Sequence, residues 1–502
     1  MNAVELKNIT KRFARVVANN NVDLIVRRGE IHAVVGENGA GKTTLMRILY
    51  GMIKPDSGKI FINERAVNIN DPSDAISLGL GMVHQHFMLI PVFTVTENVI
   101  LGMEPTKGAY IDYKTAKEKV KEISTKYGLE IDPDLKIEQL PIGIQERVEI
   151  LKLLYRGADI LILDEPTAVL TPRETKELFK IMRSLKEQGK TIILITHKLD
   201  EVLEISDRVT VMRQGRSVGV LETEKTTKEE IAELMVGRPV LFEVQKGKAN
   251  PGEIILELKN VCAGSQRRQS TLKDVSLTVR SGEIHGIAGV EGNGQTELVE
   301  VITGLRKIKS GEILFRGLSI ANESPRKIFE LGIAHVPEDR QKFGLVLDFT
   351  LYENLILGLH YRKPFSSACA LNFRRIFKEA EDLIYNYDIR PRDYTLPARN
   401  LSGGNQQKLI MAREMNKHPQ LLVASHPTRG VDIGGIEFIH KKLIEARDKG
   451  AGILLVSADL SELLSLCDRI SVIYNGIIVG TFLPGELNEF QLGLLMTGGT
   501  QG

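Results

Sequence analysis

A phosphate-binding sequence pattern occurs twice in this chain, once complete and once altered. The complete copy spans residues 36–44 (GENGAGKTT) and directly follows the apolar segment 31–35. Glycines at this spacing let backbone N–H groups surround phosphate oxygens, and the helix that follows presents its positive end to them. The pattern therefore requires a strand before it and a helix after it. In the altered copy, 289–297 (GVEGNGQTE), Gln295 stands where the complete copy has Lys42.

The sequence around the two motifs repeats as well. Gly289 follows Gly36 by 253 residues, and segments before and after both motifs match between the halves: 4–9 with 256–261, 28–32 with 281–285, and 57–61 with 310–314. A repeat of this length indicates a duplicated domain rather than a solenoid. We therefore predict one domain over 1–237, a linker over 238–252, and a second domain over 253–502, because the stretch 237–252 has Gly, Pro and charge at both ends.

Strand and helix patterns alternate along the first half. The short apolar runs 160–163, 191–195 and 209–212 are typical of buried strands. Between them, residues 172–188 have helical apolar spacing and end at Gly189, a residue that commonly terminates helices. This alternation predicts an α/β fold in each half, with a mostly parallel sheet covered by helices on both faces.

Composition excludes several classes of protein. A net charge of +2 argues against a dominant nucleic-acid surface, so no nucleic-acid partner is expected. The three cysteines lie far apart in sequence, which favours buried thiols over disulfides or a metal site. The first residues lack a signal-peptide pattern. No run reaches the ~18 apolar residues that a membrane span needs, so we expect any membrane role to be peripheral and to depend on partners.

The complete copy of the motif predicts specific chemistry. Lys42 is expected to contact the β- and γ-phosphates and Thr43 to ligate Mg²⁺. Downstream, Asp164 and Glu165 end the apolar run 160–163. Such a pair fits one carboxylate on Mg²⁺ and one polarising the attacking water. The alternative is an ordinary strand with a solvated acidic end.

Three further side chains occur in an order that fits a nucleotide site. Gln85 follows 81–84 and could sense the γ-phosphate and the metal, while His197 ends the run 191–196 and could contact the γ-phosphate. A lone histidine at a strand end is usually structural, but its place in this series favours a functional role. Phe13, upstream of the loop, could stack on adenine or could equally belong to the core.

This order of motifs resembles the ATP-binding cassette family, and the resemblance covers nearly the whole chain, twice. The family's most specific marker, Leu-Ser-Gly-Gly-Gln, occurs in close form in the second half alone, at 401–407 (LSGGNQQ). Kinases and GTPases with the same phosphate loop lack this signature. The resemblance implies two P-loop cassettes, each with a mostly parallel core, an antiparallel β subdomain and a helical lobe. It makes ATP and Mg²⁺ the expected cofactors.

The resemblance also assigns roles to individual residues. It makes Glu165, His197 and Gln85 catalytic, and it places Thr43, Gln85 and Asp164 on the metal. The residues expected to bind ATP are Phe13, Gly36, Glu37, Asn38, Gly39, Ala40, Gly41, Lys42, Thr43, Thr44, Ser402, Gly403, Gly404 and Asp432.

The two halves have lost complementary parts of this set. Where the first half has Lys42, Asp164, Glu165 and His197, the second has Gln295, Ser425, His426 and Ala458; where the second has Ser402, Gly403 and Asp432, the first has Pro141, Ile142 and Thr171. Proline has no backbone N–H to offer a phosphate. In the family, two cassettes pack head to tail, and each ATP lies between one phosphate loop and the other cassette's signature. The losses therefore predict one complete ATP site and one degenerate site.

Two cassettes without a membrane span resemble the ATPase subunits of importers. The resemblance implies two integral-membrane permease subunits, an extracytoplasmic solute-binding protein that acts through them, and a peripheral location on the cytoplasmic face of the cell membrane. The segment 86–136, in the helical lobe, is expected to touch a permease. Its apolar stretch 87–93 could equally be a packed core segment.

The transported solute is the least constrained part of the prediction. The unequal tandem resembles importers of nucleosides and of ribose, xylose and galactose, and both groups share 336–340 (VPEDR) and 427–432 (PTRGVD). The stretches 81–89 and 141–151 favour nucleosides, with pentose or galactose import as the alternative. A more distant alternative is a soluble tandem cassette that acts on ribosomes or damaged DNA. The signature and the duplication argue against a P-loop kinase.

Overall fold

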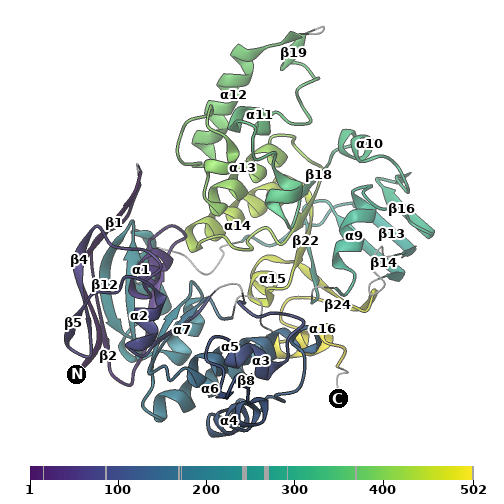
Figure 1. Cartoon of the computed structure of the whole chain (residues 1–502). Coiled ribbons are helices and arrows are strands. Elements are labelled where there is room, and N and C mark those ends of the chain that lie inside the picture. Colours follow the sequence, from purple (N-terminus) through teal and green to yellow (C-terminus); the bar gives the residue numbers. More distant parts are fainter. Residues whose placement is uncertain are drawn as a thin grey trace. The chain divides into compact units, whose positions relative to one another are not determined.

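The computed structural model describes residues 1–14, 16–84, 87–167, 170, 172–239, 246–264, 271–290, 292–367 and 370–499. It consists of two compact units, Met1–Val240 and Leu241–Gly502 (Figure 1). Each unit combines a small antiparallel sheet, a larger and mostly parallel sheet, and helices packed around them. The α/β class predicted for both halves is confirmed.

The antiparallel sheet of unit 1 has the strand order β2-β1-β4-β5. Its strands are β1 (Asn2–Phe13), β2 (Val16–Arg27), β4 (Ser57–Ile62) and β5 (Arg65–Val67). Alternate residues such as Val4, Leu6, Leu24 and Val26 are fully or almost fully buried, because one face of the sheet packs on the core while the other faces solvent.

The larger sheet of unit 1 has the strand order β12-β11-β3-β10-β9-β6, and only the pairing of β12 with β11 is antiparallel. Its strands are β3 (Ile31–Gly36), β6 (Leu80–Val83), β9 (Ile160–Asp164), β10 (Thr191–Ile195), β11 (Arg208–Arg213) and β12 (Arg216–Glu222). Every residue of β3, β9 and β10 is buried, as expected for parallel strands covered on both faces. The predicted strands 160–163, 191–195 and 209–212 are therefore confirmed.

The helices of unit 1 lie on both faces of this sheet or form a lobe beside it. They are α1 (Lys42–Leu49), α2 (Pro72–Ser77), α3 (Val95–Ile100), α4 (Tyr113–Lys126), η1 (Ile137–Gln139), α5 (Ile142–Tyr155), α6 (Pro172–Glu187), α7 (Leu199–Ile205), η2 (Thr223–Lys225) and α8 (Lys228–Val236). Helix α6 matches the predicted segment, and Gly189 beyond it has a φ of +84°. Glycine adopts this backbone conformation at no steric cost.

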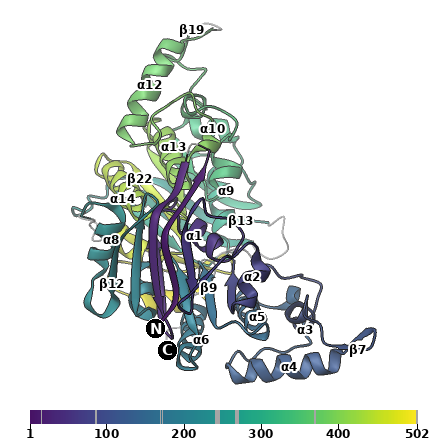
Figure 2. The ribbon, with the colours of Figure 1, turned by 60° about the vertical axis from the view of Figure 1, so that its left-hand side comes forward.

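The helical lobe of unit 1 is built from α3, α4 and α5. Figure 2 shows α3, α4 and the short hairpin of β7 (Thr106–Lys107) and β8 (Tyr110–Ile111) extending away from the sheets of this unit. Val99, Val120 and Leu151, one from each helix, are fully buried in a shared apolar core. A capping box between Thr94 and Glu97 fixes the start of α3.

Unit 2 repeats this plan. Its antiparallel sheet has the order β14-β13-β16-β17, and its larger sheet has the order β24-β23-β15-β22-β21-β18, which matches the larger sheet of unit 1 strand for strand. The strands are β13 (Ile254–Ala263), β14 (Leu272–Arg280), β15 (Ile284–Ala288), β16 (Ser310–Phe315), β17 (Leu318–Ser319), β18 (Ile333–Val336), β19 (Ser366–Ser367), β20 (Ala370–Leu371), β21 (Leu421–Ser425), β22 (Gly452–Ser457), β23 (Arg469–Tyr474) and β24 (Ile477–Phe482). The duplication seen in the sequence is therefore a duplication of the fold.

The helices of unit 2 follow the same order as those of unit 1. They are α9 (Gln295–Ile302), α10 (Pro325–Glu330), η3 (Arg340–Gly344), α11 (Leu351–Leu355), α12 (Phe373–Asn386), η4 (Ala398–Asn400), α13 (Gly403–Met415), α14 (Ile433–Asp448), α15 (Leu460–Leu466) and α16 (Glu489–Met496). Across the ranges described above, no helix is both long enough and apolar enough to span a bilayer.

Candidate functional site

The phosphate loop of unit 1 lies between β3 and α1. The Lys42 side chain is buried and folds back over the loop, where its Nζ donates hydrogen bonds to the carbonyl oxygens of Gly36 (2.6 Å) and Glu37 (3.1 Å). A Cβ added at Gly36 would lie 2.3 Å from the carbonyl oxygen of Met212, so only glycine fits there. The backbone is thus held in a tight turn with the ammonium group inside it, which suits a phosphate group.

The other residues predicted to bind phosphate lie on the same turn. Asn38 and Gly39 are exposed at its tip, Ala40 is buried beneath it, and Thr43 and Thr44 open the first turn of α1. Gly41 precedes the helix with a φ of +96°, in the left-handed region that favours glycine. The N–H groups of this first helical turn need an acceptor from outside the helix.

Asp164 ends β9 close to the start of α1. Burial is the largest cause that raises the pKa of Asp164, to about 6, and the neighbouring Glu165 carboxylate adds to it, whereas Lys42 and a hydrogen bond with Thr43 oppose the shift. Buried carboxylate and hydroxyl oxygens are ligands that suit Mg²⁺, which takes only one or two carboxylates beside phosphate and water oxygens. The donor set of Thr43 and Asp164 therefore fits this cation.

Glu165 and His197 meet because β9 and β10 are parallel neighbours whose carboxyl ends lie at the same edge of the sheet. Nδ1 of His197 lies 3.1 Å from Oε1 of Glu165. This hydrogen bond is the main reason why the pKa of Glu165 lies below its ordinary value. Glu165 has a φ of +51°, and its backbone N–H donates to the carbonyl oxygen of Ile195 (2.9 Å). The carboxylate is thus ionised at neutral pH and held in a fixed orientation.

Of the remaining predicted residues of unit 1, the structure describes some but not all. Gln85 and Thr171 lie outside the described residues. Phe13 ends β1 and is 45% exposed, so it is not a core residue. Nζ of Lys11 lies 5.6 Å from the centre of its ring. The apolar stretch 87–93 is only partly packed, since Met88 and Val92 are each 59% exposed whereas Leu89 packs against the core of the lobe.

The phosphate loop of unit 2 keeps the backbone but lacks the charge. Nε2 of Gln295 donates to the carbonyl oxygen of Gly289 (3.1 Å), which corresponds to Gly36, and the side chain is buried. Ser425 ends β21 as Asp164 ends β9. His426 has a φ of +44°, close to that of Glu165, and Ala458 follows β22. This half therefore keeps the turn of the phosphate loop but has other residues in place of Lys42, Asp164 and Glu165.

The signature of unit 2 brings its predicted residues together. Ser402 is exposed directly before α13, and its Oγ accepts a hydrogen bond from Nδ2 of Asn405 (2.9 Å). Asp432 caps α14 by accepting from the N–H of Gly435 (2.8 Å). A Cβ added at Gly404 would lie 3.4 Å from Oδ2 of Asp432. The start of α13 and the loop before α14 are therefore in contact.

The corresponding turn of unit 1 is changed. Pro141 precedes α5 in place of a serine, and Ile142 is 47% exposed at the first position of the helix. Proline removes an N–H donor, and the isoleucine side chain adds bulk where a phosphate would approach.

Sequence reasoning missed two groups of polar side chains near these loops. In unit 1, Glu149 accepts from the N–H of Met88 (2.5 Å), and Nζ of Lys152 donates to the Met88 carbonyl oxygen (3.1 Å). In unit 2, Arg340 donates to the carbonyl oxygen of Arg429. Charged residues on the buried side of α5, and the charged run at 338–340, are the signals that could have pointed to them.

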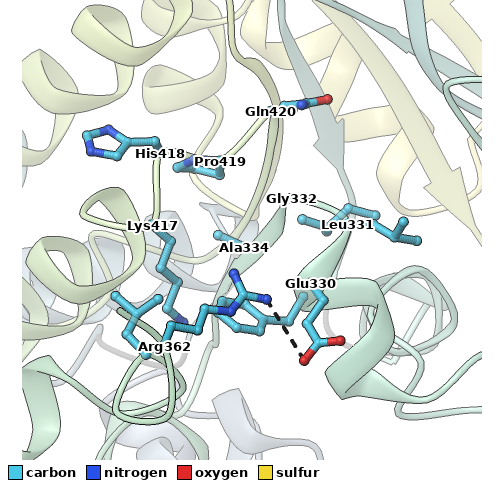
Figure 3. Close-up of a pocket in the computed structure, with 12 residues that line it drawn as sticks. Glu330, Leu331, Gly332, Ala334, Arg362, Lys417, His418, Pro419 and Gln420 are labelled. Atoms are coloured by element: carbon cyan, nitrogen blue, oxygen red, sulfur yellow. Dashed lines mark ion pairs between the residues drawn. The ribbon is translucent and has the colours of Figure 1, made fainter. Parts of the chain in front are cut away.

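Unit 2 also has a pocket that lies away from its phosphate loop. Figure 3 shows it between α10, the loop after α11 and the turn before β21, with Arg362 3.9 Å from Glu330 in an ion pair. Gly332 and Gln420, which line it, directly precede β18 and β21. It therefore lies at the opposite edge of the parallel sheet from the phosphate loop, which follows the carboxyl end of β15.

The chain is similar along nearly its full length to import ATP-binding proteins. A guanosine import ATP-binding protein of Bacillus subtilis is 53% identical, over 99% of this chain and 98% of its own length. A nucleoside import ATP-binding protein of Lactococcus lactis subsp. cremoris is 51% identical, over 99% of this chain and 98% of its own length. A glucose import ATP-binding protein of Haloferax volcanii is 44% identical, over 99% of this chain and 96% of its own length.

The family comparison agrees with the duplicated fold. The family model described as ABC transporter matches residues 19–168 and, a second time, residues 272–429. Each match begins before a phosphate loop and ends just after the strand that follows the signature helix. The chain therefore belongs to the ABC transporter family, and it is an ATP-binding ATPase built from two cassettes.

Proposed function

We propose that this chain powers the import of a solute, most specifically a nucleoside, through separate membrane permeases, and that one of its two ATP sites hydrolyses ATP. The observation that carries this proposal is the distribution of the changed residues. Every altered phosphate-loop and catalytic position falls in unit 2, and every altered signature position falls in unit 1. Independent loss would not sort the residues in this way, whereas a site shared between two cassettes requires it.

In the competent site, the phosphate loop of unit 1 holds the nucleotide. Lys42 contacts the β- and γ-phosphates, and Thr43, Asp164 and Gln85 hold Mg²⁺, which neutralises charge on the phosphates when it is bound. Glu165 accepts a hydrogen bond from the attacking water and aligns it with the γ-phosphate. His197 holds the Glu165 carboxylate in place, and Phe13 stacks on the adenine.

The signature of unit 2 completes this site. Ser402, Gly403 and Gly404 present a hydroxyl and the free N–H groups at the start of α13 to the γ-phosphate, and Asp432 stands beside them. The second site pairs Gln295, Ser425, His426 and Ala458 with Pro141, Ile142 and Thr171, and it does not hydrolyse ATP. The functional bounds that follow are 1–237 for the first cassette, 238–252 for the linker and 253–502 for the second.

The helical lobe of unit 1 offers a surface to a permease. Met88, Val92 and Met103 expose apolar side chains there. The Met88 backbone is held by Glu149 and Lys152 on α5, the helix that follows the altered signature, so a movement of α5 would displace this surface. We place the chain on the cytoplasmic face of the membrane with two permease subunits, which receive solute from an extracytoplasmic binding protein.

A nucleoside is the proposed solute because the guanosine and nucleoside relatives are 53% and 51% identical to this chain. A sugar is the second candidate, supported by the 44% identity to the glucose relative. This chain need not touch the solute, so the assignment comes from relatedness and not from the geometry of a solute site.

Uptake of labelled guanosine, set against labelled ribose and glucose, tests the proposal in cells with and without the gene. We expect guanosine uptake to require the wild-type chain and Lys42→Ala to fail to restore it. Loss of sugar uptake alone would overturn the solute assignment and leave the ATPase role intact. Unchanged uptake of all three solutes would contradict both nucleoside and sugar import.

A further inference from the structure

Three segments of unit 2 meet around one arginine. Arg340 begins η3, after β18, and its Nη1 donates to the carbonyl oxygen of Arg429 (2.8 Å) in the loop that leads to Asp432. A Cβ added at Gly403 would lie 2.6 Å from Nη2 of Arg340, and one added at Gly430 would lie 3.4 Å from it. The guanidinium group is therefore wedged between the start of α13 and the loop that precedes α14.

A second contact ties the same loops together. The Arg429 side chain forms an ion pair with Glu338, two residues before Arg340. On the other side of the loop, Oγ1 of Thr428 donates to Oε1 of the buried Glu462 (2.8 Å). The backbone between Thr428 and Asp432 is thus fixed from both sides by side chains of other segments.

The placement of Arg340 is electrostatically costly. Its guanidinium group is half-buried, and within the described part of the chain it forms no ion pair with a carboxylate, although the charge of the adjacent Asp339 offsets part of the cost of burial. It also stands at the N-terminus of α13, where the helix dipole is already positive and disfavours a cation. A cation retained in such surroundings is expected to have a role beyond stability.

The same arrangement cannot form in unit 1. There the sequence has Phe87, Ala168 and Ile142 at the positions of Arg340, Arg429 and Gly403. Unit 1 is the half whose signature is altered. The arginine contact therefore accompanies the intact signature and is missing, together with it, from the other cassette.

We propose that Arg340 is a positioning residue for ATP hydrolysis, which holds the signature and the loop bearing Asp432 in one fixed relation so that Ser402 and Asp432 reach the nucleotide together. This inference rests on the proposed site shared by unit 1 and unit 2. In unit 1, the segment after β6 carries Gln85, which we propose to sense the nucleotide. In unit 2, the matching segment after β18 carries Arg340, which holds the signature in position.

The test compares Arg340→Ala and Arg340→Lys with Ser402→Ala in the purified full-length chain. ATP hydrolysis gives kcat and KM, and a fluorescent ATP analogue gives the Kd for nucleotide. For Arg340→Ala we expect kcat to fall roughly tenfold to hundredfold, as for a deleted charge-assisted hydrogen bond. The Kd should stay within about twofold, because Lys42 and the loop of unit 1 are untouched. Lysine keeps the charge and one donor without the planar fork, so Arg340→Lys should be intermediate.

Hydrogen exchange of the full-length chain provides a readout of position. Amides of 403–405 and 429–431 should exchange faster in Arg340→Ala than in the wild type, while those of β3 and β9 should not change. If Arg340→Ala fails to fold, the kcat, Kd and hydrogen exchange of Arg340→Lys test the positioning role of Arg340 instead.

The outcomes separate this inference from the proposed function. An unchanged kcat for the Arg340 variants beside a reduced kcat for Ser402→Ala would overturn the role of Arg340 and leave the shared site intact. An unchanged kcat for Ser402→Ala as well would overturn the shared site, and the role of Arg340 with it. Equal losses in kcat and in nucleotide affinity would point to general disruption and would also overturn the positioning role.

Discussion

The phosphate loops of the two units have nearly the same backbone and very different chemistry. Lys42 and Gln295 both donate to the carbonyl oxygen of the glycine that opens the loop. The glycines before the two helices have φ angles of +96° and +109°. The amide of Gln295 thus replaces the hydrogen bond of the lysine but not its charge. The turn is therefore stable without a phosphate-binding cation, and the shape of the loop alone does not reveal whether it can hold ATP for hydrolysis.

The same contrast extends to the strands behind the loops. In unit 1, Thr167 and Thr196 both donate to Glu201 (2.7 and 3.3 Å), and in unit 2 the corresponding Thr428 and Ser457 both donate to Glu462 (2.8 and 2.6 Å). These buried networks maintain the loops in both halves. The lysine and the two carboxylates that we propose to act on the phosphates and the metal, Lys42, Asp164 and Glu165, occur in unit 1 and are replaced in unit 2, so the supporting network persists where these groups do not.

Removing the lysine should give the largest difference between the halves. We expect Lys42→Ala to reduce ATP turnover below detection, since the ammonium group is the main positive charge for the β- and γ-phosphates. The matched variant Gln295→Ala should keep turnover within about twofold, because it deletes a neutral hydrogen bond. Steady-state phosphate release measures both. Comparable losses in the two variants would contradict the inequality of the loops.

Replacing the Glu165 carboxylate should give the second-largest effect on ATP turnover. Glu165→Gln keeps the size of the side chain but cannot accept a proton from water, so kcat should fall about 10²–10⁴-fold, the range of a lost general base. His426→Gln is the control in the other half and should have little effect. Rapid turnover in Glu165→Gln would remove the glutamate from its assigned role.

Substitutions in the two signature segments should have a smaller effect on kcat, and again an unequal one. Ser402→Ala removes one hydroxyl contact to a charged phosphate, and we expect kcat to decrease roughly tenfold to hundredfold. Pro141→Ala, at the matching position of unit 1, should leave kcat within about twofold, because the altered site lacks a catalytic carboxylate in any case. Hydrolysis assays under saturating ATP distinguish the two. A larger effect from Pro141→Ala would reverse the assignment of the sites.

The smallest expected effect concerns stability. Burial, assisted by Glu149, raises the pKa of Glu146 on α5 to about 8 from an ordinary value of 4.5, whereas unit 2 has the buried amide Gln407 at the same position. The stabilisation is complete below pH 4.5 and is lost progressively up to about pH 8, because over this range the unfolded chain releases the proton of Glu146 while the folded chain keeps it. Glu146→Gln should therefore flatten the fall in Tm across this range by a few degrees.

The reciprocal change places an acid in unit 2. Gln407→Glu should introduce a new decrease in Tm as the pH rises above the ordinary pKa of a glutamate, since it creates a second buried acid in a similar helix. Calorimetry of the full-length chain at several pH values measures both variants. Parallel Tm curves for wild type and Glu146→Gln would show that Glu146 does not carry its proton in the folded state.

Much of the fold was predictable because its signals are local. The apolar run 160–163 forms β9 as predicted, and α6 ends just before Gly189, where the chain leaves the helix with a positive φ. The phosphate loop depends on glycines whose spacing is visible in the sequence. The duplicated α/β plan followed from these features and from the repeat.

The contacts between distant segments were not predictable in the same way. The meeting of Glu165 and His197 depends on the pairing of β9 with β10, and the hold of Glu149 and Lys152 on Met88 depends on how α5 packs. The stretch 87–93 allowed either a core or a surface from its composition. Only the packing of the lobe showed that Met88 and Val92 are exposed while Leu89 packs against the core of the lobe.

The neutral amide of Gln295 has an energetic consequence for transport. Under the proposed function, the second loop has an amide where the first has a cation that can hold a triphosphate, so each closing and reopening of the pair would draw on the cleavage of a single phosphoanhydride bond. The steepest solute gradient that such a machine can sustain is then set by the free energy of one ATP rather than two.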